Sequence, residues 1–188
     1  MEIINNYLYI LKEDFKNKRM YKHIPNLLTF IRLLSPLFII PLFLYNKYRL
    51  AFILVIVSAI TDIFDGLIAR KFNLTSEFGR LLDAVTDKVF SLSLLIPLIK
   101  ISNLYIVLII LEIAIGISNY LAHYKNRKPQ THYIGKIKTV VEFIFIALCY
   151  LSFVSSIDIN ILNVVFVINI ILELITLSIY VVKNKQSN

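Results

Sequence analysis

The sequence predicts an all-α integral membrane fold, with six transmembrane helices preceded by an amphipathic juxtamembrane helix. Three observations predict it. Hydrophobic residues make up 58% of the 188 residues and the mean hydropathy is +0.75, whereas an ordinary soluble domain has roughly 45–50% apolar residues. Apolar stretches recur at about the 20-residue length that a helix needs to cross the hydrocarbon of a bilayer. Along the chain, joints rich in lysine and arginine alternate with joints that have few of them, as expected when cytoplasmic loops carry the excess of basic residues.

Residues 1–22 are predicted to form an amphipathic helix on the cytoplasmic membrane surface. Lysines follow a set of apolar residues at helical spacing: Ile4, Leu8, Leu11 and Phe15. An irregular tail is the alternative. The chain is thus expected to divide into a cytoplasmic amphipathic segment, 1–22, and a six-helix membrane domain, 23–188.

Six apolar stretches, separated by short polar joints, are the expected spans: 26–45, 50–69, 83–100, 103–122, 135–154 and 159–182. An even number of spans puts both termini on one side. With that side cytoplasmic, the outside keeps only Lys47, Arg49 and Lys100, and every other joint or terminus rich in lysine and arginine lies inside. This asymmetry predicts a multi-pass protein of the cell membrane with both termini in the cytoplasm.

The formal charge of +8 is best explained by the same topology. Basic residues that flank apolar spans contact anionic membrane lipid and fix orientation, so no nucleic-acid partner is expected. The single cysteine, Cys149, lies in an apolar run and excludes an internal disulfide.

Four aspartates interrupt this apolar chain at one predicted depth, near the cytoplasmic face. Asp62 and Asp65 are three residues apart at the end of the second span, and Asp83 and Asp87 are four apart at the start of the third. Each pair shares one helix face. Antiparallel neighbours joined by a short loop bring the two faces together, so the four carboxylates are expected to converge.

Converging carboxylates in a membrane need positive charge among them, because each costs about 2.5–3.5 kcal/mol at the centre of a span and less near the interface. Mg²⁺ or Mn²⁺ with oxygen ligands satisfies this need, and a pair of ions sharing carboxylates suits phosphoryl chemistry. Ion pairing with Arg70, Arg80 and Lys88 is the alternative. That alternative leaves unexplained why two of only four glycines, Gly66 and Gly79, lie in the same block.

These residues form a pattern with fixed spacing: Asp62-x-x-Asp65-Gly66-x-x-Ala69-Arg70, eight residues, then Gly79-x-x-x-Asp83-x-x-x-Asp87. The pattern resembles the signature of the CDP-alcohol phosphatidyltransferase family. The segment "IPNLLTFIRLLSPLFIIPLF" resembles the family's first span, and "GKIKT" at 135–139 resembles the start of the fifth span in its phosphatidylglycerophosphate synthases.

The resemblance implies six transmembrane helices, a homodimer and an active site that opens to the cytoplasmic leaflet. It also implies a reaction in which an alcohol hydroxyl attacks the β-phosphorus of a CDP-linked lipid such as CDP-diacylglycerol, and CMP leaves. Two Mg²⁺ or Mn²⁺ ions would be held by Asp62, Asp65, Asp83 and Asp87, and Asp87 would also take the proton of the acceptor. For the CDP-lipid, the resemblance implies contacts from Asn26, Thr29, Asp65, Gly66, Ala69, Arg70, Ser76 and Gly79.

A phosphorylated acceptor such as glycerol 3-phosphate needs cations beside the metal site, and Arg32, Lys136 and Lys138 are the candidates. Arg32 lies inside an apolar span, where an isolated charge is costly and functional by default. Its alternative role is to be neutralised by the aspartates, and the two lysines could simply serve topology. Glu112, Asn119 and Glu142 either line the acceptor pocket or hydrogen-bond between helices, and Glu173 has no assigned role.

The function expected from these residues is phosphatidyl transfer to glycerol 3-phosphate. Other acceptors of the same family stay open: those of a cardiolipin synthase, an inositol-phosphate or serine transferase, or an archaeal-lipid enzyme. A divalent-cation transporter is the alternative of another class, because membrane carboxylates also occur there. It predicts acidic residues through both leaflets, whereas the four motif aspartates share one depth.

Overall fold

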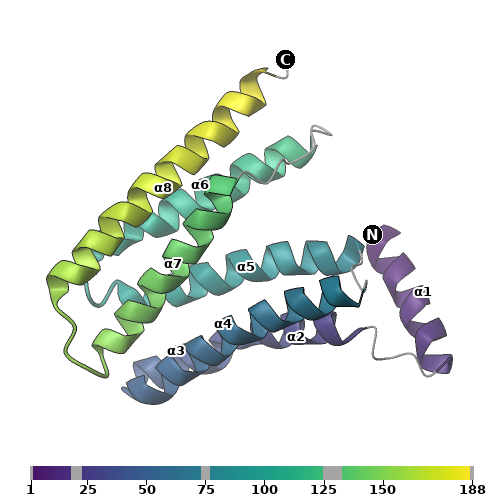
Figure 1. Cartoon of the computed structure of the whole chain (residues 1–188), viewed down its shortest axis with the longest axis horizontal. Coiled ribbons are helices and arrows are strands. Elements are labelled where there is room, and N and C mark those ends of the chain that lie inside the picture. The colour runs from purple at the N-terminus through teal and green to yellow at the C-terminus, as the bar shows by residue number, and fades with distance from the viewer. Residues whose placement is uncertain (1, 18–22, 73–76, 125–132, 187–188) are drawn as a thin grey trace.

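The computed structural model describes residues 2–17, 23–72, 77–124 and 133–186, and these residues are almost entirely helical (Figure 1). The helices, in chain order, are α1 (Glu2–Lys16), α2 (Ile24–Leu34), α3 (Pro36–Leu44), α4 (Tyr48–Lys71), α5 (Glu77–Leu98), the short 3₁₀ helix η2 (Asn103–Tyr105), α6 (Ile106–Tyr124), α7 (Tyr133–Ser152) and α8 (Ile159–Gln186). The predicted all-α fold is confirmed.

The first apolar stretch, expected as one helix over 26–45, is divided into α2 and α3 at Ser35 and Pro36. Proline has no backbone N–H and therefore cannot continue the hydrogen-bond ladder at that point. The Ser35 carbonyl nevertheless accepts a bond of 3.0 Å from the N–H of Ile39, so the two helices follow each other without a loop.

Among the described residues, three segments are long and apolar enough to cross a membrane: Ile24–Leu44, Asn103–Leu121 and Ile159–Val181. The helices α4, α5 and α7 have 24, 22 and 20 residues. They carry several of the charged residues of the two clusters described below, which lowers their apolar content: Asp62, Asp83, Asp87, Lys88, Lys138 and Glu142. Large apolar side chains such as Leu37, Phe38 and Val164 are exposed on the outer surface. Soluble monomers rarely expose extensive apolar patches, so this surface suits contact with lipid.

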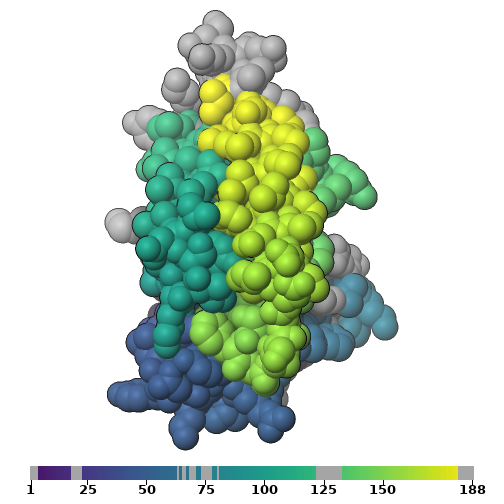
Figure 2. Space-filling model, turned by 90° about the vertical axis from the view of Figure 1, so that its left-hand side faces the viewer, coloured from purple at the N-terminus to yellow at the C-terminus, as the bar shows by residue number. Residues whose placement is uncertain are grey.

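The packing of the helices places α5 in the middle of the molecule. Helix α2 packs against both α4 and α5, and α5 in turn contacts α6 and α7. Helix α8 packs along α6 and α7, and Figure 2 shows α8 lying beside α6 on one face of the molecule. The buried core is formed mainly by side chains from α3 to α8: Ile39, Phe43, Val55, Phe90, Leu94, Leu108, Phe145, Ile146 and Phe166.

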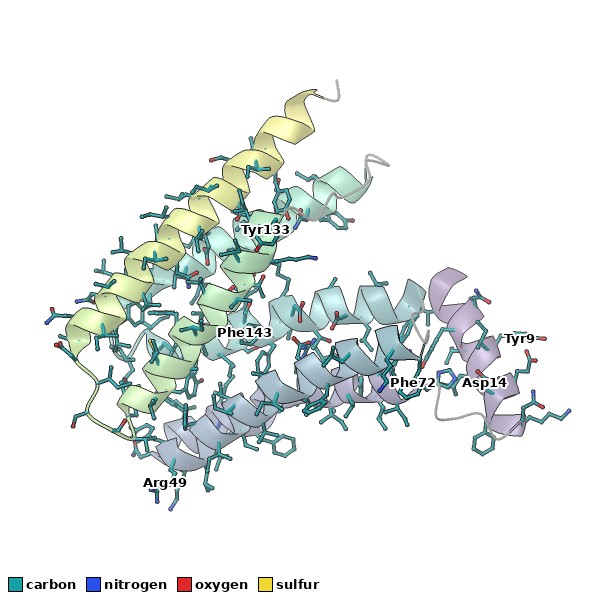
Figure 3. All side chains as sticks on the ribbon, in the orientation of Figure 1. Tyr9, Asp14, Arg49, Phe72, Tyr133 and Phe143 are labelled. Atoms are coloured by element: carbon teal, nitrogen blue, oxygen red, sulfur yellow. The ribbon has the colours of Figure 1, made fainter. Side chains whose placement is uncertain are left out.

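Helix α1 lies across the ends of α2 and α5 (Figure 1). The Tyr7 ring stacks on Phe78 of α5, with 4.0 Å between the ring centroids, and Asp14 lies 3.3 Å from His23 at the start of α2. Tyr9, by contrast, is 70% exposed and points away from the other helices (Figure 3). One side of α1 therefore contacts the ends of α2 and α5. Its exposed side carries Ile4, Leu8 and Phe15, three of the apolar residues predicted at helical spacing.

Candidate active site

Three of the four motif aspartates converge in the described structure. Asp62 comes from α4, and Asp83 and Asp87 come from successive turns of α5. Each of them offers a carboxylate oxygen within 4.8 Å of the others. Their side chains are 33%, 49% and 39% exposed, respectively, so an ion or ligand could reach them. We call this group the aspartate cluster.

Arg32 of α2 lies among these aspartates, and its side chain is fully buried. One terminal nitrogen donates to the Oδ1 atoms of both Asp83 and Asp87, at 2.8 and 2.9 Å. The other pairs with Asp62. Helix α2 packs against both α4 and α5, and its Arg32 joins the aspartates of these two helices.

The residues of the aspartate cluster suit a divalent cation. Carboxylate oxygens are the hard ligands that Mg²⁺ and Mn²⁺ prefer. Three carboxylates and one guanidinium leave a formal charge of −2, so positive charge can still be added. The fourth predicted ligand, Asp65, lies on α4, but its side chain falls outside the described residues.

The predicted CDP-lipid contacts are described only in part. The side chains of Asp65, Ala69 and Arg70, the surroundings of Gly66, and the whole of Ser76 lie outside the described residues. Gly79 is half-buried in the first turn of α5. Asn26 and Thr29 lie one turn apart on α2, where the buried Thr29 hydroxyl donates to the carbonyl of Pro25 at 3.0 Å.

Asn26 is oriented by α1, a contact that the sequence did not reveal. Its side-chain nitrogen donates to the Tyr7 hydroxyl at 3.1 Å, and that hydroxyl lies 3.0 Å from Nδ1 of His23. The same residues border an apolar cavity of about 670 Å³ between α1, α2 and α5, lined by Tyr7, Leu11, His23, Ile24, Asn26, Leu27, Phe30, Phe78 and Leu82.

A second charged group, which we call the Glu–Lys cluster, lies on the other side of α5, and all of its members except Lys88 are buried. It consists of Lys88 of α5, Glu112 of α6, Lys138 and Glu142 of α7, and Glu173 of α8. Glu112 pairs with Lys88 through one oxygen and with Lys138 through the other. Lys138 also donates to Oε2 of Glu142 at 2.7 Å, and it lies 4.0 Å from Glu173.

A cavity of about 280 Å³ connects the two charged clusters. Its lining includes Asp87, Lys88, Glu112, Lys136, Lys138 and Glu142. Phe143 also lines it and points from α7 toward α5 (Figure 3), where its ring stacks with Phe90 at a centroid distance of 5.8 Å. Asp87 therefore belongs to the aspartate cluster and to the wall of this cavity.

The cations expected to bind the acceptor occupy three different environments. Lys136 is exposed and lines the cavity. Lys138 is buried in the Glu–Lys cluster, and Arg32 is buried in the aspartate cluster. Their separation could not be derived from the sequence, although the spacing of Lys138 and Glu142, four residues apart on a helix, does predict one of the ion pairs.

Comparisons with known proteins identify the family of this chain. The model of the CDP-alcohol phosphatidyltransferase family matches residues 22–182. A protein of Rickettsia felis named CDP-diacylglycerol–glycerol-3-phosphate 3-phosphatidyltransferase is 31% identical over 142 residues, which cover 71% of this chain and 78% of the relative. A protein of Aquifex aeolicus with the same name is 30% identical over 172 residues, covering 86% and 95%.

A third relative, from Mycobacterium tuberculosis, is named probable phosphatidylglycerophosphate synthase and is 31% identical over 135 residues, covering 67% of this chain and 65% of the relative. The family match spans both charged clusters and the cavity between them. The chain therefore belongs to the CDP-alcohol phosphatidyltransferase family and is a transferase of that class.

Proposed function

We propose that this enzyme transfers a phosphatidyl group from CDP-diacylglycerol to glycerol 3-phosphate and releases CMP. The position of Asp87 carries the proposal, because this residue joins the aspartate cluster to the cavity that also contains Lys136. An alcohol in that cavity would have its hydroxyl beside a carboxylate and its phosphate near a cation. The names of the relatives support glycerol 3-phosphate as the acceptor.

In this proposal Asp62, Asp65, Asp83 and Asp87 would hold two divalent cations, Mg²⁺ or Mn²⁺, which when bound would polarise the pyrophosphate and stabilise the departing CMP. The hydroxyl oxygen of the acceptor forms a bond to the β-phosphorus, and the bond from that phosphorus to the CMP oxygen breaks. Asp87 accepts the hydroxyl proton, since a general base has to lie within hydrogen-bond reach of the attacking group.

The two substrates would approach from opposite sides of α5. We propose that the CDP-lipid contacts Asn26, Thr29, Gly66, Ala69, Arg70, Ser76 and Gly79, as well as Asp65. The acceptor would occupy the 280 Å³ cavity, a volume suited to a small polar molecule. Lys136 would contact its phosphate directly, while Arg32 and Lys138 would add positive charge from buried positions.

We further propose that α2–α3, α4, α5, α6, α7 and α8 form six membrane spans, with both termini and the aspartate cluster on the cytoplasmic side. The distribution of lysine and arginine supports this topology. In the same arrangement α1 would lie on the cytoplasmic surface, with its exposed apolar residues in contact with lipid. The functional unit would be a homodimer.

The acceptor is tested with purified enzyme, CDP-diacylglycerol labelled in its lipid part, and a panel of alcohols: glycerol 3-phosphate, inositol phosphate, serine and phosphatidylglycerol. We expect labelled phosphatidylglycerophosphate and an equal amount of CMP with glycerol 3-phosphate alone. A product formed from another alcohol, with none from glycerol 3-phosphate, would refute the proposed acceptor and leave the family assignment intact.

A further inference from the structure

Glu142 is the buried carboxylate whose hydrogen bonds are incomplete at the wall of the proposed acceptor cavity. The residue is 1% exposed, and its Oε2 accepts from Lys138 at 2.7 Å. Its Oε1 has no hydrogen-bond partner among the described residues. A buried oxygen without a donor costs about 1–3 kcal/mol, and more when it is charged, so a ligand that brings a donor would be stabilised here.

The other glutamate on this wall differs in this respect. Glu112 is also buried, but both of its oxygens are already paired, one with Lys88 and the other with Lys138. Glu173 is fully buried behind Lys138 and is not part of the cavity lining. Of the three glutamates, Glu142 therefore combines a place on the cavity wall with an oxygen that lacks a donor.

The chemistry of the missing donor follows from the surrounding charges. A carboxylate oxygen accepts hydrogen bonds, so it cannot bind the phosphate of an acceptor. An ammonium group is less suited than a hydroxyl, because Lys138 already donates to Oε2 of the same carboxylate at 2.7 Å and a second cation at Oε1 would lie close to it. A neutral hydroxyl supplies a donor without adding charge. The site therefore suits an acceptor with a second hydroxyl group besides the one that reacts.

We propose that Glu142 is a specificity-determining residue, which accepts a hydrogen bond from the acceptor's non-reacting hydroxyl. The inference rests on the proposed function and extends it. With glycerol 3-phosphate, a terminal hydroxyl would react beside Asp87, the phosphate would lie near Lys136, and the hydroxyl on the central carbon would bond to Glu142. Asp87, Lys136 and Glu142 all line the same cavity.

The test compares glycerol 3-phosphate with 3-hydroxypropyl phosphate, which lacks only the central hydroxyl. Purified full-length enzyme is assayed with CDP-diacylglycerol and Mg²⁺, and the ratio of the two kcat/KM values is measured. A lost hydrogen bond to a charged group lowers kcat/KM about 10- to 100-fold, so the wild-type enzyme should prefer glycerol 3-phosphate by that factor. In Glu142→Met the ratio should fall to near 1.

Two matched variants separate recognition from structural damage. Glu112→Gln weakens the same cluster and should lower both kcat/KM values while the ratio stays at its wild-type level. Lys136→Ala should lower the two kcat/KM values by the same factor, because both acceptors keep their phosphate. Glu142→Gln retains a polar group and should give an intermediate ratio, which decides the question even if Glu142→Met fails to fold.

A wild-type ratio near 1, or an unchanged ratio in both Glu142 variants, would overturn the role of Glu142 and leave the proposed function standing. Absence of any turnover of glycerol 3-phosphate by the wild-type enzyme would instead overturn the proposed function, and this inference with it. The two failures are therefore distinguishable in one set of assays.

Discussion

Arg32 is the residue with two predicted roles on which the structure bears most directly. From the sequence alone, a buried arginine near a phosphoryl-transfer motif is expected to bind the acceptor's phosphate. In the structure its guanidinium pairs with Asp62, Asp83 and Asp87. These contacts favour the alternative role, in which Arg32 balances the charge of the aspartate cluster, and its contact with the acceptor stays a prediction.

The balance of charge leads to a prediction for Arg32→Ala. Removing a positive charge from a cation site strengthens the attraction for Mg²⁺, so the Mg²⁺ concentration that gives half-maximal activity should fall. Arg32→Lys keeps the charge and should stay near the wild-type value, although an ammonium cannot bridge the carboxylates as the planar guanidinium does. A raised acceptor KM with unchanged Mg²⁺ dependence would show instead that Arg32 contacts the acceptor.

Metal removal is a second test of the aspartate cluster. We expect EDTA to abolish CMP release, because the carboxylates alone cannot stabilise the charge that develops on the pyrophosphate. Addition of Mg²⁺ or Mn²⁺ in excess of EDTA should restore the activity, while Ca²⁺, which prefers more ligands at longer distances, should restore less. Full activity of the enzyme in metal-free buffer would contradict the metal site.

The helices show where sequence reasoning succeeds and where it stops. Apolar length and basic flanks located the ends of each helical stretch to within six residues, because these signals are local. The division between α2 and α3 was missed, although Pro36 is a local signal for it. The Glu–Lys cluster could not be predicted as a whole, because its glutamates come from α6, α7 and α8 and only their packing brings them together.

Helix α1 was predicted as an amphipathic surface helix, and its contacts give it a further role in orienting α2. Tyr7→Phe removes the hydroxyl that accepts from Asn26, and one such bond contributes about 1 kcal/mol. We expect the KM for CDP-diacylglycerol to rise about fivefold, with the KM for glycerol 3-phosphate unchanged. Tyr9→Phe, on the exposed side of the same helix, is the control and should leave both values unchanged.

An equal effect of Tyr7→Phe on the two substrates would argue against this contact as a specific support for Asn26. It would indicate that α1 as a whole is bound less firmly to the other helices. The stacking of Tyr7 on Phe78 also attaches α1 to α5. The phenylalanine variant keeps that stacking interaction, so the comparison isolates the hydroxyl.

For the molecule as a whole, the charge distribution predicts the orientation in the membrane. The enzyme has a single cysteine, Cys149, which is buried, so a new surface cysteine can be labelled selectively. In intact cells a membrane-impermeant maleimide should label Lys47→Cys, which lies between α3 and α4, and should leave Gln186→Cys unlabelled until the membrane is opened. The reverse pattern would refute the predicted orientation.

The signature of four aspartates could be recognised without a structure because its residues lie close together in the sequence at fixed spacing. The family match confirms this recognition. The cavity could not be found in the same way, since its walls come from α5, α6, α7 and α8. The sequence therefore predicted the class of chemistry, whereas the location proposed for the acceptor required the packing of the whole domain.

The central claim is that the aspartate cluster catalyses phosphatidyl transfer, and CMP release from CDP-diacylglycerol in proteoliposomes tests it most directly. Asp83→Asn removes one charge from the cluster, and Asp158→Asn makes the same change at an exposed position between α7 and α8. We predict that the wild-type enzyme and Asp158→Asn release CMP in proportion to lipid product, while Asp83→Asn, still folded, is slower by at least about 100-fold. Wild-type activity in Asp83→Asn, or passage of Mg²⁺ across the membrane without any CMP release, would contradict the claim.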